Sequence, residues 1–549
     1  MKSNLTNEDF SMGSPEAWDP EERASLKYNF YPIKQFASVL EKKNMFLVGR
    51  RGSGKSAIAL MLQSEAPYKY KDTIKGEKDQ YGEYIEIVRL IGKEREKNKE
   101  IDIKAAIRRL WIWVIPLKAM QTLCKNYRKS KFSENDNIKN IRYYFDTLPK
   151  PLNIDSTIGH VLTQTFEEGL KVLKKEGEAS FIKHLVNLNQ TDAFRTAFRS
   201  LNEETMYTPL FLVFDTLESY QIFNPLMTPG LQGILEALVS LRTDERMEGI
   251  SIKFFFPAEI YDEIILPFPG KMQQRAVFLR WKVRELGSML ARRYLSILKR
   301  TQAVKKSEIE RLKEIVDMSY KDANWHKLRS QFWYETKFLP EKIINTRNRE
   351  EDCFAYIIRH SLRRPRDLIA LLQGIIDEAR DNEEFPRMSN KSVVSGLHKP
   401  SIQLQILQDS LTAYEGRFDA NLLKSSQSVF YKRPMIMRGR EIIRFAEELY
   451  ELYPLANIDP SDFVSTLIRC GVIGLVLDEE LPQNKSELYC MARFEYIQQG
   501  TVPWSQRHLY AIHPIMADAF HMQYPEDRGC VYPYPDLSED TELEFQAGI

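Results

Sequence analysis

The feature that most constrains this chain is a glycine-rich stretch between an apolar run and a helical pattern. Met45 to Val48 are all apolar, and residues 57–62 read Ala-Ile-Ala-Leu-Met-Leu. Between them lies Gly49-Arg50-Arg51-Gly52-Ser53-Gly54-Lys55-Ser56, which fits the pattern G-x-x-x-x-G-K-[ST] at every fixed position. The sequence therefore predicts a buried strand, a phosphate-binding loop and a helix, in that order.

The residue types in this loop match the chemistry of phosphate binding. Gly52 and Gly54 allow backbone conformations in which successive N–H groups converge on phosphate oxygens, and the helix that follows directs its positive end toward the same oxygens. Lys55 can reach the β- and γ-phosphates, and the Ser56 hydroxyl can ligate Mg²⁺. The predicted phosphate site consists of Gly49, Arg50, Arg51, Gly52, Ser53, Gly54, Lys55, Ser56 and Ala57.

A second apolar run, residues 209–214, ends in Asp215 and has the composition of a central parallel strand. Asp215 is predicted to hold Mg²⁺ together with Ser56. A third run, residues 252–256, is followed by Glu259, and a short strand is expected at 276–279. Strands that alternate with helices predict an α/β fold with a parallel sheet, whose ligands bind at the carboxyl ends of the strands.

Other segments are assigned by the spacing of their apolar residues. Residues 84–90 are a further strand candidate, and residues 91–208 form a long helical insertion. From Trp281 to about Arg380 the pattern is helical, and a change of composition at 386–400 indicates a linker. Two helices, a hairpin with a polar tip at 478–486 and a last helix then follow the pattern of a winged helix, and the residues from Pro525 are predicted to be a flexible tail.

Composition limits the function less than the motifs do. Lys and Arg number 78 and Asp and Glu 76, so the net charge of +2 indicates no nucleic-acid or membrane partner. The five cysteines are scattered and the N-terminus lacks a signal-peptide pattern, so a reduced, cytoplasmic protein is expected. The most apolar run, 110–117, is too short for a membrane span.

This order of motifs resembles AAA+-related P-loop ATPases, nearest to the origin-recognition-like branch and the neighbouring STAND and KAP groups of bacterial ATPases. Residues 49–58 and Arg364-Pro365-Arg366-Asp367-Leu368-Ile369 carry most of the likeness. The resemblance implies a P-loop ATPase core with a large helical insertion, a helical lid and a C-terminal winged helix. The implied domains are an N-terminal segment (1–40), the core (41–282, insertion 91–208), the lid (283–385), a winged-helix-like domain (395–524) and an acidic flexible tail (525–549).

The same resemblance implies roles for individual side chains. Glu259 is at the position of a γ-phosphate sensor, Arg366 or Arg364 at that of a lid arginine, and Arg275 at that of an arginine finger that reaches a neighbouring subunit. Members of this branch that hydrolyse ATP well place Glu directly after the strand-ending Asp, but here that residue is Thr216. Either Glu218 is therefore expected to act as the catalytic base, with Glu86 as a weaker candidate, or hydrolysis is expected to be slow and the protein to be a nucleotide-gated switch.

Two functions are open on these grounds. The first is an ATP- and Mg²⁺-dependent switch that acts through protein partners, with self-association through Arg275, as in regulatory ATPases of bacterial defence or mobile-element loci. The alternative is a DNA-engaging, origin-recognition-like ATPase. The alternative is favoured by basic residues in one helical stretch with Trp111 and Trp113, namely Lys104, Arg108, Arg109, Lys118, Lys125, Arg128, Lys129 and Lys131.

The net charge of the predicted winged helix is unfavourable for DNA binding by this domain. Residues 436–523 contain seven Lys and Arg against twelve Asp and Glu, a net charge of −5. Because DNA affinity depends largely on the neutralisation of phosphates, a module of this charge is poorly suited to bind it. A protein-contact role is expected for this domain.

Overall fold

The computed structural model describes residues 6–14, 16–75, 102–130, 135–148, 153–215, 227–259, 274–322, 327–411, 430–452, 459–477, 489–495, 502–524 and 530–533. The chain forms two compact units. We call residues 36–48 and 58–278 the sheet unit, and residues 1–35, 49–57 and 279–549 the lid unit. The predicted phosphate loop belongs to the lid unit.

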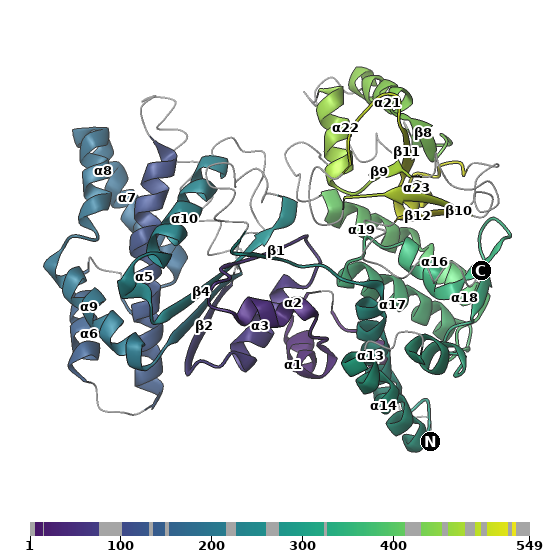
Figure 1. The fold of residues 1–549 in the computed structure, drawn as a ribbon, viewed down its shortest axis with the longest axis horizontal. Helices are drawn as coiled ribbons and strands as arrows, with labels where there is room; N and C mark the ends of the chain where they lie inside the picture. Colours follow the sequence, from purple (N-terminus) through teal and green to yellow (C-terminus); the bar gives the residue numbers. More distant parts are fainter. Residues whose placement is uncertain are drawn as a thin grey trace. The chain divides into compact units, whose positions relative to one another are not determined.

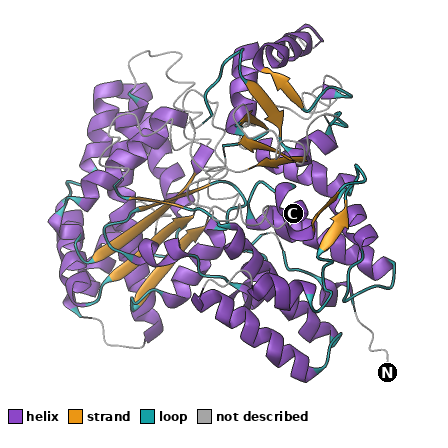
Figure 2. Cartoon of the chain, turned by 45° about the vertical axis from the view of Figure 1, so that its right-hand side comes forward, coloured by secondary structure: helices purple, strands orange, loops and turns teal. Residues whose placement is uncertain are grey.

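The sheet unit is built on a five-stranded parallel sheet of order β2-β3-β4-β1-β5 (Figure 2). Its strands are β1 (Phe46–Gly49), β2 (Tyr70–Lys75), β3 (Leu210–Asp215), β4 (Ile250–Pro257) and β5 (Ala276–Phe278). The α/β class and the strands predicted at β1, β3, β4 and β5 are confirmed. The strand predicted at 84–90 lies outside the described residues, and the strand beside β3 is β2.

Helices cover both faces of this sheet (Figure 1). On one face lie α5 (Ile103–Ser130) and α10 (Met227–Arg242), and on the other lie α3 (Lys55–Glu65) and α2 (Lys34–Leu40). Trp111 of α5 is fully buried, and its ring centroid lies 6.0 Å from those of Phe214 and Phe254 on β3 and β4. The first helix of the insertion is therefore a core layer of the sheet unit.

In its described residues, the rest of the insertion is helical, as predicted. It comprises α6 (Asp136–Thr147), α7 (Ile158–Glu176), α8 (Glu178–Asn187) and α9 (Asp192–Tyr207), and the turn η3 (Glu245–Met247) follows α10. Trp113 of α5 is buried, and its indole N–H donates to the Tyr144 hydroxyl of α6 at 2.7 Å. This bond satisfies the polar edge of a large ring in the interior.

The lid unit begins with η1 (Asn7–Phe10) and α1 (Pro20–Asn29), which pack against α13 (Val283–Thr301). Arg293 of α13 and Glu22 of α1 form a buried ion pair at 2.5 Å. Further elements are α14 (Lys306–Asp322), the π-helix η4 (Leu328–Tyr334), α16 (Cys353–Arg359), α17 (Pro365–Asp381), α18 (Asn390–Leu397) and α19 (Pro400–Leu411). A small hairpin of β6 (Lys342–Ile344) and β7 (Glu350–Asp352) interrupts the predicted helical stretch, and α18 occupies the predicted linker.

The C-terminal part of the lid unit contains a mixed sheet of order β12-β10-β9-β11-β8. Its elements are β8 (Ile436–Arg438), α21 (Gly439–Leu452), α22 (Pro460–Arg469), β9 (Ile473–Val476), β10 (Tyr489–Arg493), β11 (Leu509–Ile512), α23 (Pro514–Ala519) and β12 (Cys530–Pro533). The expected helices and the antiparallel β9–β10 pair are present, while the hairpin tip at 478–486 lies outside the described residues.

β12 lies in the segment expected to be a flexible tail. It pairs in parallel with β10, and Val531 and Tyr532 are buried. The Tyr532 hydroxyl donates to Glu351 of β7 at 2.6 Å. Residues 530–533 are thus an ordered strand.

None of the helices within the described ranges combines the length and the apolar character that crossing a bilayer requires.

Candidate phosphate-binding site

The loop after β1 has the backbone conformation that its glycines predict. Gly52 has φ +78° and Gly54 has φ +94°, both in the left-handed region that side chains with a Cβ rarely adopt. The Ser53 N–H donates to the Arg50 carbonyl at 3.1 Å, which closes the turn, and α3 begins at Lys55. The loop therefore leads directly into a helix N-terminus, where backbone N–H groups have no partner within the helix.

Lys55 is buried at 2% exposure. Its ammonium group donates to the Gly49 carbonyl at 2.8 Å and to the Arg50 carbonyl at 3.0 Å. The positive charge is thus held inside the loop, where a phosphate group bound to the loop would meet it.

The N-terminus of α17 packs against the loop within the lid unit. The Arg366 N–H donates to the Gly52 carbonyl at 3.3 Å, and a Cβ added at Gly52 would lie 3.1 Å from the Arg366 Cβ. Gly52 is therefore required both by its torsion angle and by this close approach. The two motifs that carry the family resemblance are in direct contact.

Arg364 lies in a buried network of polar contacts. It is buried, and its guanidinium pairs with the fully buried Asp367 at 2.8 Å. It also donates to the Ser410 hydroxyl at 3.1 Å and to the Arg51 carbonyl at 3.4 Å. Burial raises the pKa of the Asp367 carboxyl above its usual value, and the neighbouring Arg364 opposes that shift.

Arg366 is the more accessible of the two arginines. Its side chain is 15% exposed and pairs with Asp409 of α19 at 3.5 Å, a longer contact than the Arg364–Asp367 pair. An arginine in a long, partly exposed ion pair can exchange its carboxylate partner for a phosphate at lower cost than one in a buried network. Of the two candidates that the sequence left open, the geometry favours Arg366 as the nucleotide-contacting residue.

This difference gives a paired prediction. Arg366→Ala is expected to leave the thermal stability nearly unchanged and to weaken ATP binding about tenfold, because it removes one charge-assisted hydrogen bond. Arg364→Ala is expected to destabilise the lid unit by about 3–5 kcal/mol, because it leaves Asp367 buried without its cation. Calorimetric titration with ATP and thermal unfolding of both variants test this, and the reverse pattern would assign the nucleotide contact to Arg364.

Two contacts of the loop are not predicted by the sequence. The Trp281 indole N–H donates to the Ser53 carbonyl at 2.8 Å, and its ring lies 3.8 Å from the position of a Cβ at Gly54. Arg50 is buried and donates to the Arg469 carbonyl at the end of α22, at 2.5 Å. The partners are 228 and 419 residues apart in the chain, so no local pattern signals them.

The candidate acids lie in the sheet unit. Asp215 is the last residue of β3 and is buried at 6% exposure, and Glu259 follows β4 by two residues and is also buried. Because β1, β3 and β4 are parallel strands of one sheet, their carboxyl ends lie along the same edge. Thr216, Glu218 and Glu86 lie outside the described residues.

Arg275 lies at the other edge of this sheet. It directly precedes β5, which pairs in parallel with β1, and its carbonyl accepts hydrogen bonds from the N–H groups of Met45 and Phe46. Its guanidinium contacts the Met45 Sδ at 3.7 Å. Arg275 is therefore at the amino ends of the strands, and a finger role requires a second copy of the chain.

Comparison with known families assigns one segment of the lid unit. Residues 310–404 match the FunZ-associated C-terminal helical domain. The match begins within α14 and ends within α19, and it includes Arg364 and Arg366. No curated protein and no solved structure significantly matches the chain. The matched segment thus includes α17, whose N-terminus contacts the loop.

Three of the basic residues on α5 have acidic partners. Lys104 pairs with Glu236 at 2.5 Å and Lys118 with Asp72 at 2.9 Å, while Arg128 lies 3.5 Å from Asp155. Trp111 and Trp113 of the same stretch are buried in the core. The apolar face of α5 is buried, and its basic face pairs with acids from other elements. Because those acids are distant in sequence, the sequence alone shows the basic residues without their partners.

Proposed function

We propose that the chain is an ATP-binding P-loop ATPase that acts as a nucleotide-driven switch through protein partners. The observation that carries the proposal is the loop itself. Its two glycines have positive φ, Lys55 is buried within it, and α3 starts at its end. Each of these features serves the binding of phosphate groups, in addition to the two hydrogen bonds by which Lys55 holds the loop.

The donor atoms of Ser56 and Asp215 also fit Mg²⁺. Mg²⁺ prefers hard oxygen ligands, and the Ser56 hydroxyl and the Asp215 carboxylate are of that kind. In this proposal Ser56 and Asp215 hold the ion, which would neutralise charge on the phosphates. Lys55 binds the β- and γ-phosphates, and Glu259 acts as the polar sensor of the γ-phosphate.

The contacts of the loop suggest how binding would be read out. Arg366 would leave Asp409 and turn to the nucleotide, which changes the contact between α17 and α19. Arg50 joins the loop to the end of α22 in the C-terminal domain, so a change in loop conformation would reach that domain as well. A partner bound there would sense the nucleotide state.

We further propose that hydrolysis is slow and that Glu218 is its base, since Thr216 occupies the place where efficient relatives have Glu. The FunZ-associated domain links the chain to a FunZ system. It is consistent with a regulatory subunit of a bacterial defence or mobile-element system.

The proposal is tested by measuring ATP turnover of the full-length chain with and without DNA, and the mass of the particle with ATP. We expect slow, Mg²⁺-dependent turnover that DNA does not change and that Glu218→Gln abolishes while Glu86→Gln does not. Turnover stimulated many-fold by DNA would instead support the origin-recognition-like alternative. A monomer in every nucleotide state would exclude Arg275 as a finger acting on a neighbouring subunit.

A further inference from the structure

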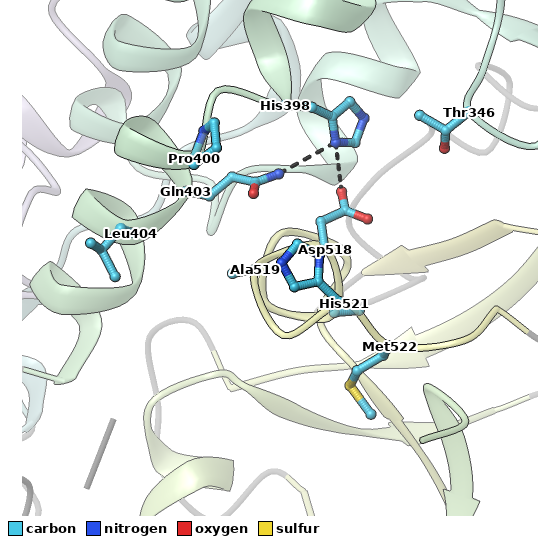
Figure 3. Close-up of a pocket in the computed structure, with 10 residues that line it drawn as sticks. Thr346, His398, Pro400, Gln403, Leu404, Asp518, Ala519, His521 and Met522 are labelled. Atoms are coloured by element: carbon cyan, nitrogen blue, oxygen red, sulfur yellow. Dashed lines mark hydrogen bonds and ion pairs between the residues drawn. The ribbon is translucent and has the colours of Figure 1, made fainter. Parts of the chain in front are cut away.

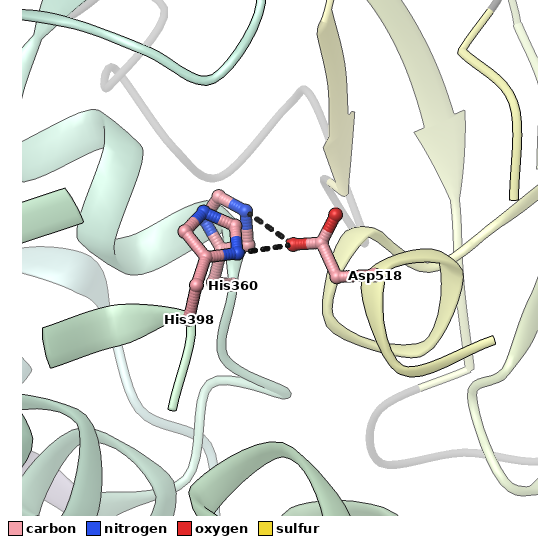
Figure 4. Close-up of side chains that lie close together, drawn as sticks. All are labelled: His360, His398 and Asp518. Atoms are coloured by element: carbon pink, nitrogen blue, oxygen red, sulfur yellow. Dashed lines mark ion pairs between the residues drawn. The ribbon is translucent and has the colours of Figure 1, made fainter. Parts of the chain in front are cut away.

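A second group of side chains with ligand chemistry lies in the lid unit, away from the loop (Figure 4). His360 follows α16, His398 follows α18, and Asp518 lies on α23. The Asp518 Oδ2 is 3.3 Å from the His360 Nε2 and 3.1 Å from the His398 Nδ1. The three ligand atoms all lie within 4.8 Å of one another.

Each of these three side chains is held by a hydrogen bond at its other polar atom. The His360 Nδ1 is 2.7 Å from the Tyr356 carbonyl, and the His398 Nε2 is 2.5 Å from the Tyr356 hydroxyl. The Asp518 Oδ1 accepts from the Tyr524 hydroxyl at 2.7 Å. Histidines that bind metals are oriented in this way, with the second ring nitrogen donating to a carbonyl or another oxygen.

The bond to Tyr356 fixes the tautomer of His360. A carbonyl can only accept, so the His360 Nδ1 carries the proton, and in a neutral ring the Nε2 then presents a lone pair to Asp518. The ring is fully buried, and both the His360 Nε2 and the Asp518 Oδ2 are buried atoms that have no hydrogen-bond partner among the described residues. A cation between these two atoms would satisfy both of them.

The spacing also suits a metal ion. Zn–N and Zn–O bonds of about 2.0–2.1 Å in a tetrahedron separate neighbouring ligand atoms by about 3.3 Å. The side chains of His398 and Asp518 are 20% and 11% exposed, and both line a pocket of about 600 Å³ together with Gln403 and His521 (Figure 3). The group is therefore closed on the His360 side and open toward the pocket.

We propose that His360, His398 and Asp518 bind a divalent transition metal ion, for which Zn²⁺ is the best fit, and that the pocket faces its remaining coordination position. Two nitrogen ligands, one carboxylate oxygen and an open position are the donor set of a catalytic or ligand-binding zinc site rather than of a closed structural one. Both histidines lie in the FunZ-associated domain, and Asp518 lies in the C-terminal domain. The ion would therefore link these two domains. This inference does not depend on nucleotide binding.

The test is a Zn²⁺ titration of the full-length protein after treatment with a chelator, against a chromophoric zinc indicator. We expect one tightly bound ion per chain. His398→Ala and Asp518→Asn are each expected to lower the affinity at least 100-fold. His508→Ala, at an exposed position of the C-terminal domain outside this pocket, is the matched control and is expected to bind Zn²⁺ as the wild type does.

Two further measurements separate a metal site from a merely structural cluster. Zn²⁺ is expected to raise the melting temperature of the wild type and not that of His398→Ala, a partly exposed position chosen because the buried His360 is needed for packing. Tyr524→Phe removes the hydroxyl that donates to the Asp518 Oδ1 and is expected to lower the affinity 10- to 100-fold. Absence of stoichiometric binding, or equal binding by wild type and His398→Ala, would overturn the proposal.

Discussion

Lys55→Ala is expected to lower the affinity for ATP at least 100-fold. The ammonium group would form charge-assisted hydrogen bonds to two phosphates, each worth about 1.5–3 kcal/mol, and 100-fold corresponds to about 2.7 kcal/mol. The group is already buried within the loop, so that no large rearrangement is needed before it meets a phosphate. Titration calorimetry with ATP or a fluorescent analogue measures the change.

The control for this experiment must separate charge from folding. Lys55 also donates to the Gly49 and Arg50 carbonyls, so its truncation removes two bonds of the loop itself. Lys55→Gln keeps an N–H donor for these carbonyls and removes the charge, and it should bind ATP as poorly as the alanine variant. Lys27→Ala, at an exposed position of α1, should bind normally. Unchanged affinity in both Lys55 variants would refute nucleotide binding at the loop.

Asp215→Ala is expected to abolish Mg²⁺-dependent turnover, by at least 100-fold, while ATP binding falls by less than about tenfold. The reason for the difference is that Lys55 and the loop N–H groups bind phosphate without the ion, whereas phosphoryl transfer depends on Mg²⁺ to neutralise developing charge. Turnover and affinity are measured separately across a range of Mg²⁺ concentrations. Asp192→Asn, whose side chain is fully exposed, is the control.

The result for the Asp215 variant also tests whether Asp215 is the residue that holds Mg²⁺. It is the last residue of a strand buried along its whole length, so thermal unfolding of the variant is measured first to establish that it folds. A variant that folds, binds ATP and still turns it over with normal Mg²⁺ dependence would show that another residue holds the ion.

The strands that the sequence predicts correctly are those with apolar runs. β3 and β4 are buried at every residue, and their apolar runs are visible without any knowledge of their neighbours. β2 reads Tyr-Lys-Asp-Thr-Ile-Lys and lies at the edge of the sheet, where alternating polar residues are tolerated. A polar edge strand gives a weak pattern, so the sequence does not predict β2, whereas the apolar run of β5 reveals the strand at the opposite edge.

The sequence predicts those parts of the candidate site that are formed by a few consecutive residues. The loop from Gly49 to Ser56 and the motif around Arg366 are each recognisable from a few consecutive residues. The choice between Arg364 and Arg366 was not, because it depends on the burial of Asp367 and on contacts with α19. The His360, His398 and Asp518 cluster was missed for the same reason, since its members are up to 158 residues apart and follow no ligand spacing.

The loop from Gly49 to Ala57 belongs to the same compact unit as the FunZ-associated domain and the C-terminal sheet, where its carbonyls and Arg50 are held by Trp281, Arg366 and Arg469. Thermodynamic linkage then works in both directions: whatever factor ATP adds to the affinity for a partner on the C-terminal domain, the partner must add to the affinity for ATP. A protein that binds α22 would thus change the fraction of chains that bind ATP at a given ATP concentration. Where the ATP concentration lies near the dissociation constant, occupancy of the nucleotide site would then report the presence of the partner.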